Sequence, residues 1–167
     1  NSSPEIEFVM RAPKSSGEFV TERDLMRAVW NLELELESAL SMGQVTEFAS
    51  FIDLGESQFK QLTVYIEFGE GSMILEKDKG DEAVAFLRSC GSSIEDGLGV
   101  LYKSKKESGE IGQLRISVVN VGTFDLLLQT AIENGAPASQ YKSPKIIRNR
   151  KMADFLEASS ALTVCFG

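Results

Sequence analysis

The sequence contains no histidine among its 167 residues. This absence excludes Ser-His and Cys-His nucleophilic catalysis and the common zinc sites, all of which need an imidazole as base or ligand. Only two cysteines are present, Cys90 and Cys165, and their separation matches no metal-ligand or redox spacing. We therefore expect no metal site in this chain, and two free, partly buried thiols in a reducing, cytoplasmic compartment.

Positive charge and long apolar runs are also scarce. The chain has 17 basic against 25 acidic residues, a net charge of -8, whereas a general nucleic-acid binder presents a basic face over much of its surface. No apolar run approaches the length needed to cross a bilayer, and no signal peptide is recognisable. The glycines of "GEG" at 69–71 lack the Lys-Ser/Thr of a phosphate-binding loop, so we interpret them as a loop tip. We expect neither nucleic acid nor membrane as a partner.

The residues that are present are typical of one globular domain. Hydrophobic residues make up 43% of the chain and charged residues 25%, and the length is sufficient for a core without disulfides or metal. The chain begins with Asn1 and opens directly on a strand-like segment. We therefore expect it to be a piece cut from a larger protein.

Periodicity predicts an α+β fold with a roughly four-stranded sheet packed against several helices. Alternation of apolar and polar residues indicates strands at 5–11, 45–54, 60–68 and 114–119, and "RAPKSSGE" at 11–18 is typical of a hinge. Helices are predicted at 21–43, 80–89, 93–106, from 123 to about 134, and at 150–160.

Several side chains support these helices. Capping boxes are indicated at Thr21-Asp24 and Ser92-Glu95, and Thr123 is the expected cap of the fourth helix. Trp30, alone on the first helix, is more often a core residue than a binding platform. The acids Glu33, Glu35 and Glu37 are most simply its solvated side.

One segment stands apart because it is strongly basic. Five of the chain's 17 basic residues lie within 142–151, which contains no acid: Lys142, Lys145, Arg148, Arg150 and Lys151. These cations could form a positive edge toward a polyanionic ligand, or they could simply balance an acidic surface at the start of the last helix. Composition and pattern leave both readings open.

Five strings, in order and at matching distances, resemble one family. They are "SFID" (50–53), "IEDGLGVLYK" (94–103), "GQLRISVV" (112–119), "VGTFDLLLQTAIENGA" (121–136) and "QYKSPK" (140–145). Together they look like the C-terminal domain of the plant acyl acid–amido synthetases, the auxin- and jasmonate-conjugating members of the acyl-adenylate-forming superfamily. "TERDL" (21–25) and the "SFID" region look closest to the jasmonate-conjugating branch.

The resemblance implies that residues 1–167 are the small, mobile C-terminal domain of a two-domain enzyme. Such enzymes use ATP and Mg²⁺ to convert a carboxylic acid to an acyl-adenylate, which the amine of an amino acid then attacks. The N-terminal domain of the same polypeptide, absent here, holds most of the ATP, Mg²⁺ and acyl-acid contacts. We expect the isolated domain to be monomeric and inactive. Neither the acyl acid nor the amino acid follows from the sequence.

The resemblance also nominates site residues. Lys142, in "QYKSP", matches the family lysine that reaches the ATP phosphates during adenylation, where a mobile ammonium stabilises developing negative charge. For Lys145, Arg148, Arg150 and Lys151 the surface interpretation is preferred. Arg11 is retained from the family's first segment, but Phe19 stands where another phosphate-contacting lysine is usual, and Lys14 is the candidate substitute. The family's usual string "PGHY", which follows the region of "SFID", is also missing, and residues 54–62 read "LGESQFKQL" instead.

These departures keep a second hypothesis open. The chain could be a non-catalytic small-ligand-binding or regulatory α+β module derived from a degenerate synthetase domain. A preceding ATP-binding domain of several hundred residues in the full-length product would separate the two hypotheses.

Overall fold

A computed structural model describes residues 19–39, 43–54, 60–135 and 144–166. Its elements follow the chain in this order: α2 (Glu22–Glu37), β1 (Val45–Asp53), β2 (Gln61–Phe68), the 3-10 turns η3 (Met73–Leu75) and η4 (Lys77–Lys79), α3 (Gly80–Gly97), α4 (Val100–Glu107), β3 (Leu114–Val119), α5 (Thr123–Glu133), β4 (Ile146–Ile147), α6 (Arg150–Ala158) and β5 (Ser160–Phe166). The α+β prediction is confirmed.

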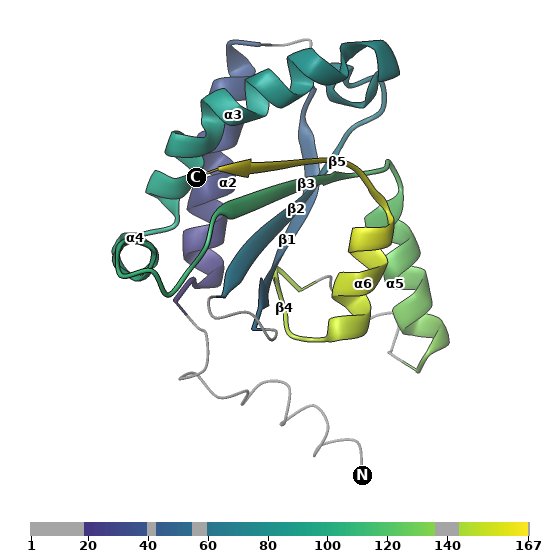
Figure 1. Ribbon diagram of the computed structural model, residues 1–167. Helices are drawn as coiled ribbons and strands as arrows, with labels where there is room; N and C mark the ends of the chain where they lie inside the picture. Colours follow the sequence, from purple (N-terminus) through teal and green to yellow (C-terminus); the bar gives the residue numbers. More distant parts are fainter. Residues whose placement is uncertain (1–18, 40–42, 55–59, 136–143, 167) are drawn as a thin grey trace.

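The strands form one mixed sheet in the order β4-β1-β2-β3-β5 (Figure 1). β1 and β2 are an antiparallel pair, and the chain then crosses through α3 and α4 to place β3 parallel to β2. β5 is antiparallel to β3 at one edge, and β4 is parallel to β1 at the other. The sheet thus has five strands in the described residues, where four were predicted. The predicted strand at 5–11 lies outside those residues.

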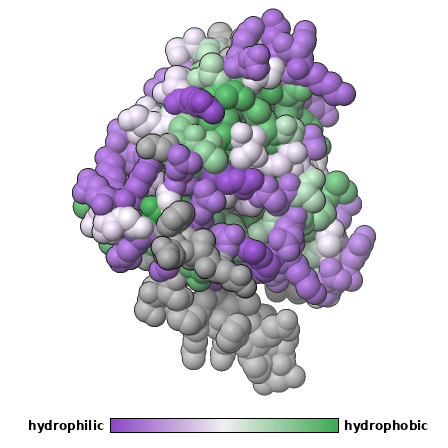
Figure 2. Space-filling view, viewed as in Figure 1, coloured by the Kyte–Doolittle hydropathy of each residue, from purple (hydrophilic) through white to green (hydrophobic). Residues whose placement is uncertain are grey.

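Helices cover both faces of the sheet (Figure 1). On one face α2, α3 and α4 enclose a large apolar cluster that includes Leu32, Leu87 and Ile116. On the other face α5 and α6 cover a smaller cluster that includes Tyr65, Phe124 and Leu156. In the view of Figure 2, hydrophobic residues gather mainly at the seam between α3 and β5, and hydrophilic residues cover most of the remaining surface.

The first predicted helix begins as expected but carries an unexpected side chain. The Thr21 hydroxyl accepts from the Asp24 amide at 3.1 Å, and the Asp24 carboxylate accepts from the Thr21 amide at 3.0 Å, so the capping box is confirmed. α2 ends at Glu37, earlier than the predicted 43. Trp30 is 60% exposed, so the prediction that it belongs to the core is wrong.

The prediction of helices at 80–89 and 93–106 is wrong at their junction. α3 runs unbroken to Gly97, with Ser92 inside it and exposed, so the capping box expected at Ser92 does not form. The break comes at Gly99, whose φ of +96° is a conformation that favours glycine. Gly97 also matters, because a Cβ there would lie 2.5 Å from the Ala28 backbone of α2. The α2–α3 contact and the turn at Gly99 therefore set this boundary.

Two further predictions need correction. The N-cap of α5 is Gly122, and the Thr123 hydroxyl donates to the Asn120 carbonyl at 2.6 Å without capping the helix. The last helix ends at Ala158, and β5 follows at once. Along β5 the inward Leu162, Val164 and Phe166 alternate with exposed residues, a strand pattern that the sequence analysis missed.

Candidate functional site

The candidate site residues Lys142, Arg11 and Lys14 lie outside the described residues, as does the predicted hinge at 11–18. The structure therefore does not test their roles. It does describe the elements on both sides of 136–143, the segment that contains Lys142. α5 precedes this segment, and Pro144, Lys145 and β4 follow it.

A buried carboxylate holds the start of α5. The N-cap Gly122 has no side chain to satisfy the first amides of the helix, which otherwise lack partners. Glu67 of β2, only 8% exposed, supplies both acceptors: its Oε1 lies 2.9 Å from the Phe124 amide nitrogen and its Oε2 lies 3.2 Å from the Gly122 nitrogen. A negative charge is also favoured at the positive end of the helix dipole. β2 thus fixes the entry to α5.

Sequence analysis did not single out Glu67. The alternation along 60–68 puts Leu62 and Glu67 on opposite faces of β2, and the structure shows both faces buried. The available signal was a glutamate between the apolar Ile66 and Phe68 of a predicted strand, together with a glycine just before a predicted helix.

Lys145 anchors the other side of the segment. Its carbonyl accepts from the Ser50 amide at 2.7 Å and from the Ser50 hydroxyl at 3.2 Å, which starts the pairing of β4 with β1. Its ammonium group pairs with Glu47 and lies 4.4 Å from the centroid of the Phe48 ring. The Lys145 side chain is only 23% exposed. Three kinds of contact with β1 therefore hold this residue in place.

Arg150 repeats this arrangement further along. Its guanidinium group lies 3.3 Å from Asp53 of β1 and 5.5 Å from the Phe51 ring centroid. The Asn149 side chain caps α6 by accepting from the amide of Lys151 at 2.8 Å. Lys145 and Arg150 thus both pair with acids of β1, Lys145 from a mostly buried position and Arg150 from an exposed one.

A polar cluster joins α6 to the sheet. Arg115 of β3 donates two hydrogen bonds to Glu157 of α6, at 2.5 and 2.6 Å, and the buried Tyr65 hydroxyl donates to the same carboxylate at 3.0 Å. The hydrogen bonds from Arg115 lower the pKa of Glu157. Burial, reinforced by Glu157, raises the pKa of Tyr65, so its hydroxyl remains a neutral donor. This cluster attaches the helix and offers no base for catalysis.

The sequence analysis placed Phe19 where the family that the chain resembles usually has a lysine. Here the side chain is 4% exposed, and its ring centroid lies 6.4 Å from that of Tyr102 in α4. This position therefore belongs to the hydrophobic core in the structure.

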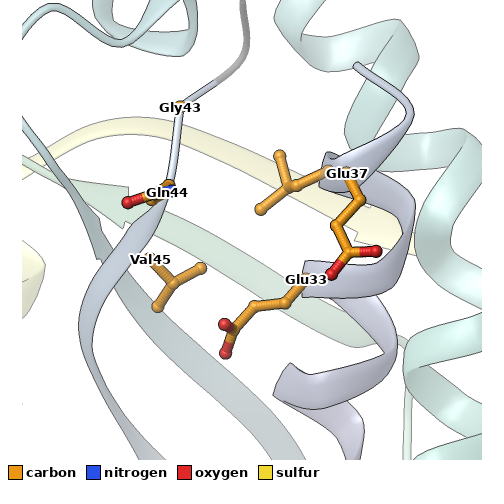
Figure 3. Close-up of a pocket in the computed structure, with 6 residues that line it drawn as sticks. Glu33, Glu37, Gly43, Gln44 and Val45 are labelled. Atoms are coloured by element: carbon orange, nitrogen blue, oxygen red, sulfur yellow. The ribbon is translucent and has the colours of Figure 1, made fainter. Parts of the chain in front are cut away.

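A hollow of about 300 Å³ lies between α2 and the start of β1. Its lining consists of Glu33, Leu36, Glu37, Gly43, Gln44 and Val45. Figure 3 shows the side chains of Glu33 and Glu37 on the α2 side of the hollow and Gln44 and Val45 on the opposite side. Sequence analysis treated these two glutamates only as a solvated helix face. Within the described ranges no group of three or more His, Cys, Asp or Glu side chains could hold a metal ion.

The two cysteines differ in their burial. Cys90 is buried and Cys165 exposed, and both are free thiols, so the prediction that both are partly buried is wrong for Cys165. Burial raises the pKa of the Cys90 thiol to about 11. None of the described helices is long and apolar enough to cross a membrane.

Sequence comparison gives several relatives, all much longer than the matched segment. The chain is 40% identical over 150 residues to a probable indole-3-acetic acid-amido synthetase, GH3.6, of Oryza sativa subsp. japonica, covering 87% of this chain and 30% of that protein. It is 32% identical over 162 residues to the 4-substituted benzoates-glutamate ligase GH3.12 of Arabidopsis thaliana, covering 94% and 28%. The chain therefore spans less than a third of the length of these relatives.

Comparison of folds also gives a GH3 protein. The structure resembles that of the AtGH3.15 acyl acid amido synthetase in complex with 2,4-DB, with a TM-score of 0.71 and 30% identity over 85% of this chain and 24% of that one. Residues 23–151 match the family described as the GH3 family C-terminal domain. This match covers most of the chain and includes α2 through β4. The chain belongs to the GH3 family, and the part of the family fold that it contains is the C-terminal domain.

Proposed function

We propose that the chain is the C-terminal domain of an ATP-dependent acyl acid amido synthetase that joins a hormone-type carboxylic acid to an amino acid. The match of residues 23–151 to the GH3 C-terminal domain carries this proposal. Relatives named as an indole-3-acetic acid-amido synthetase and a benzoates-glutamate ligase support an amide-forming ligase. In the first half-reaction the substrate carboxylate attacks the α-phosphorus of ATP and displaces pyrophosphate. In the second, the amino acid's amine attacks the acyl carbon and releases AMP.

In this proposal Lys142 supplies positive charge to the phosphates as pyrophosphate leaves. The contacts around Lys145 and the Glu67 cap would define the two ends from which the segment with Lys142 extends. Arg11 and Lys14 are the further nucleotide contacts proposed. Mg²⁺ would neutralise phosphate charge, and in this proposal the preceding domain provides its protein ligands.

The acyl acid is proposed at the level of its class. The names of the relatives favour auxin-like or benzoate-like acids, and the strings at 21–25 and 50–53 favour a jasmonate-like acid. We further propose a monomeric, cytoplasmic enzyme, for which the free thiols are supporting observations. The isolated domain is proposed to be inactive, because the pocket for the acid would lie in the preceding domain.

The decisive experiment is Lys142→Ala in the full-length enzyme. We expect acid-dependent ATP–pyrophosphate exchange to fall on the order of a hundredfold or more, and amide formation from a supplied acyl-adenylate to fall far less. Lys142→Arg should rescue poorly, because a planar guanidinium does not replace a compact ammonium. Lys151→Ala is the matched control, since Lys151 is an exposed cation nine residues further along, in the first turn of α6. Equal behaviour of the two Ala variants would refute the role of Lys142.

Phe19 favours a second candidate function, a non-catalytic ligand-binding or regulatory module. By the resemblance, Phe19 stands where the family lysine is usual, and its buried, uncharged side chain, 4% exposed, would offer no contact to a phosphate. If full-length wild-type protein showed no pyrophosphate exchange with auxin-like, benzoate-like or jasmonate-like acids but still bound one of them in calorimetry, this second function would replace the first.

A further inference from the structure

α2 carries a second apolar stripe in addition to the one that it buries. Met26, Trp30 and Leu34 are spaced four residues apart, and their exposed fractions are 53%, 60% and 47%. This spacing places them in one row on the helix surface. The other large apolar side chains exposed in the described ranges are single residues or one adjacent pair: Leu54, Val100, Leu101, Val121 and Leu126.

Among the described residues, the contacts that hold α2 in the fold lie on other sides of the helix. α2 buries Leu25, Val29 and Leu32 against the core. It meets α3 through a 2.7 Å hydrogen bond that the Asn31 side-chain Nδ2 donates to the Ser93 carbonyl, and through the close approach of Gly97 to Ala28. A helix that is apolar on two sides usually has a partner on each. The exposed stripe therefore has the character of an interaction surface.

The stripe adjoins the hollow beside β1. Glu33 and Glu37 line the hollow (Figure 3). They lie three residues from Trp30 and from Leu34 respectively, so they neighbour the stripe on the helix surface. We call Met26, Trp30, Glu33, Leu34 and Glu37 together the α2 surface. It combines an apolar row, a cavity of about 300 Å³ and two carboxylates at one end.

We propose that the α2 surface docks against the preceding domain of the full-length polypeptide. This inference rests on the proposed function, in which such a domain is present. The matched segment accounts for only 30% and 28% of two relatives, so in them this fold is accompanied by more than twice its own length of chain. α2 is the first element of the described chain and therefore stands nearest in sequence to the segment that leads to that domain.

Charge indicates what the partner presents. The end of the α2 surface beside the hollow is acidic, so the facing residues should include a lysine or arginine that enters the hollow between Glu33 and Glu37. Trp30 is the expected anchor, because tryptophan in a desolvated contact carries a large share of interface energy.

The first test labels unmodified full-length protein with hydroxyl radicals and follows the peptide that contains Trp30, the chain's single tryptophan. The reference is the same protein in urea. If the Trp30 side chain stays 60% exposed, its labelling rate should fall less than twofold relative to the protein in urea. If the α2 surface is docked, the rate should fall about fivefold or more in at least one of two states, with ATP and Mg²⁺ or without them. Protection below twofold in both states would overturn the proposal.

The second test compares Trp30→Ser with Leu126→Ser in full-length protein. Leu126 is 54% exposed on α5, on the opposite face of the sheet, so both changes remove an exposed apolar side chain. Trp30→Ser should speed proteolysis between the domains about tenfold and Leu126→Ser should not. If Trp30→Ser instead converted a dimer to a monomer in light scattering, the partner would be a second copy and the proposal would be wrong.

These tests separate the inference from the proposed function. Amide synthesis by wild-type protein with an unprotected Trp30 would leave the function standing and remove the docking surface. Protection of Trp30 in a protein that forms no amide would support the docking surface and remove the proposed function.

Discussion

The two faces of the sheet are held by different forces. The face under α2, α3 and α4 is a large apolar cluster in which Leu32, Leu87 and Ile116 are fully buried. The face under α5 and α6 has a smaller apolar cluster, and buried or half-buried ions attach its elements: Glu67 to α5 and Arg115 with Glu157 to α6. At the adjoining edge, Lys145 and Arg150 pair with acids of β1.

This difference has consequences for both stability and function. Apolar burial is non-directional, and unlike an ion pair it is neither screened by salt nor changed by titration, so the first face forms a constant base. Charge-assisted hydrogen bonds are directional, and they fix the helices that flank the segment containing Lys142 at defined positions. On the face under α5 and α6, the positions of these two helices therefore depend on single charged residues.

The largest effect is expected on the apolar face. Leu87→Ala should lower the free energy of unfolding by about 2 to 5 kcal/mol, because Leu87 is fully buried and the change leaves a cavity. Urea unfolding of the full-length protein at low and high salt should give the same loss. The control is Leu101→Ala on α4, where the side chain is 51% exposed. A loss that changed strongly with salt would contradict the comparison of the two faces.

A smaller loss of stability is expected when Glu67 is replaced on the face under α5 and α6. Glu67→Ala removes both acceptors for the first turn of α5 and should lower the free energy of unfolding by about 2 kcal/mol. Glu67→Gln keeps one acceptor and should recover part of this loss. Hydrogen exchange would locate the effect: the Phe124 amide should exchange faster in Glu67→Ala. Unchanged exchange at Phe124 would show that the cap contributes nothing.

Local patterns in the sequence were enough for part of the fold. The capping box at Thr21 was predictable because its partners lie three residues apart, and the alternating strands β2 and β3 were predictable because each carries its own period. β4 was not, because a two-residue strand has no period and exists only where β1 offers Ser50 as a partner for Lys145. β5 carries a readable alternation, but the predicted end of the last helix obscured its start.

The candidate site followed a different course. Lys142, Arg11 and Lys14 were nominated by resemblance, and they remain predictions. Glu67 could not be assigned from its own neighbourhood in the sequence, since its partners on α5 are more than fifty residues away. The exposure of Trp30 likewise depends on which side of α2 the other elements cover. α2 has more apolar residues than its core-facing side can hold, and helical periodicity alone does not tell which of them stay exposed.

The smallest effect is expected at the attachment of α6, and it depends on pH. Because hydrogen bonds from Arg115 lower the pKa of Glu157 in the folded protein, folding favours the ionised carboxylate. The resulting stability is present above the pKa of an unfolded glutamate, about 4.3, and is lost as pH falls through the lowered folded value. Since the Glu157 side chain is 42% exposed, solvent screening limits the contribution to less than about 1 kcal/mol.

The measurement is the difference in free energy of unfolding between wild type and Glu157→Gln, followed from pH 7 downward. We expect wild type to be the more stable at pH 7 and the difference to shrink below about pH 4, because acid then protonates the carboxylate and weakens its bonds to Arg115. Glu133→Gln, an exposed position on α5, is the control and should show no such trend. A difference that stayed constant down to acid unfolding would mean that the Tyr65 hydroxyl and packing, and not the ion pair, attach α6 to the sheet.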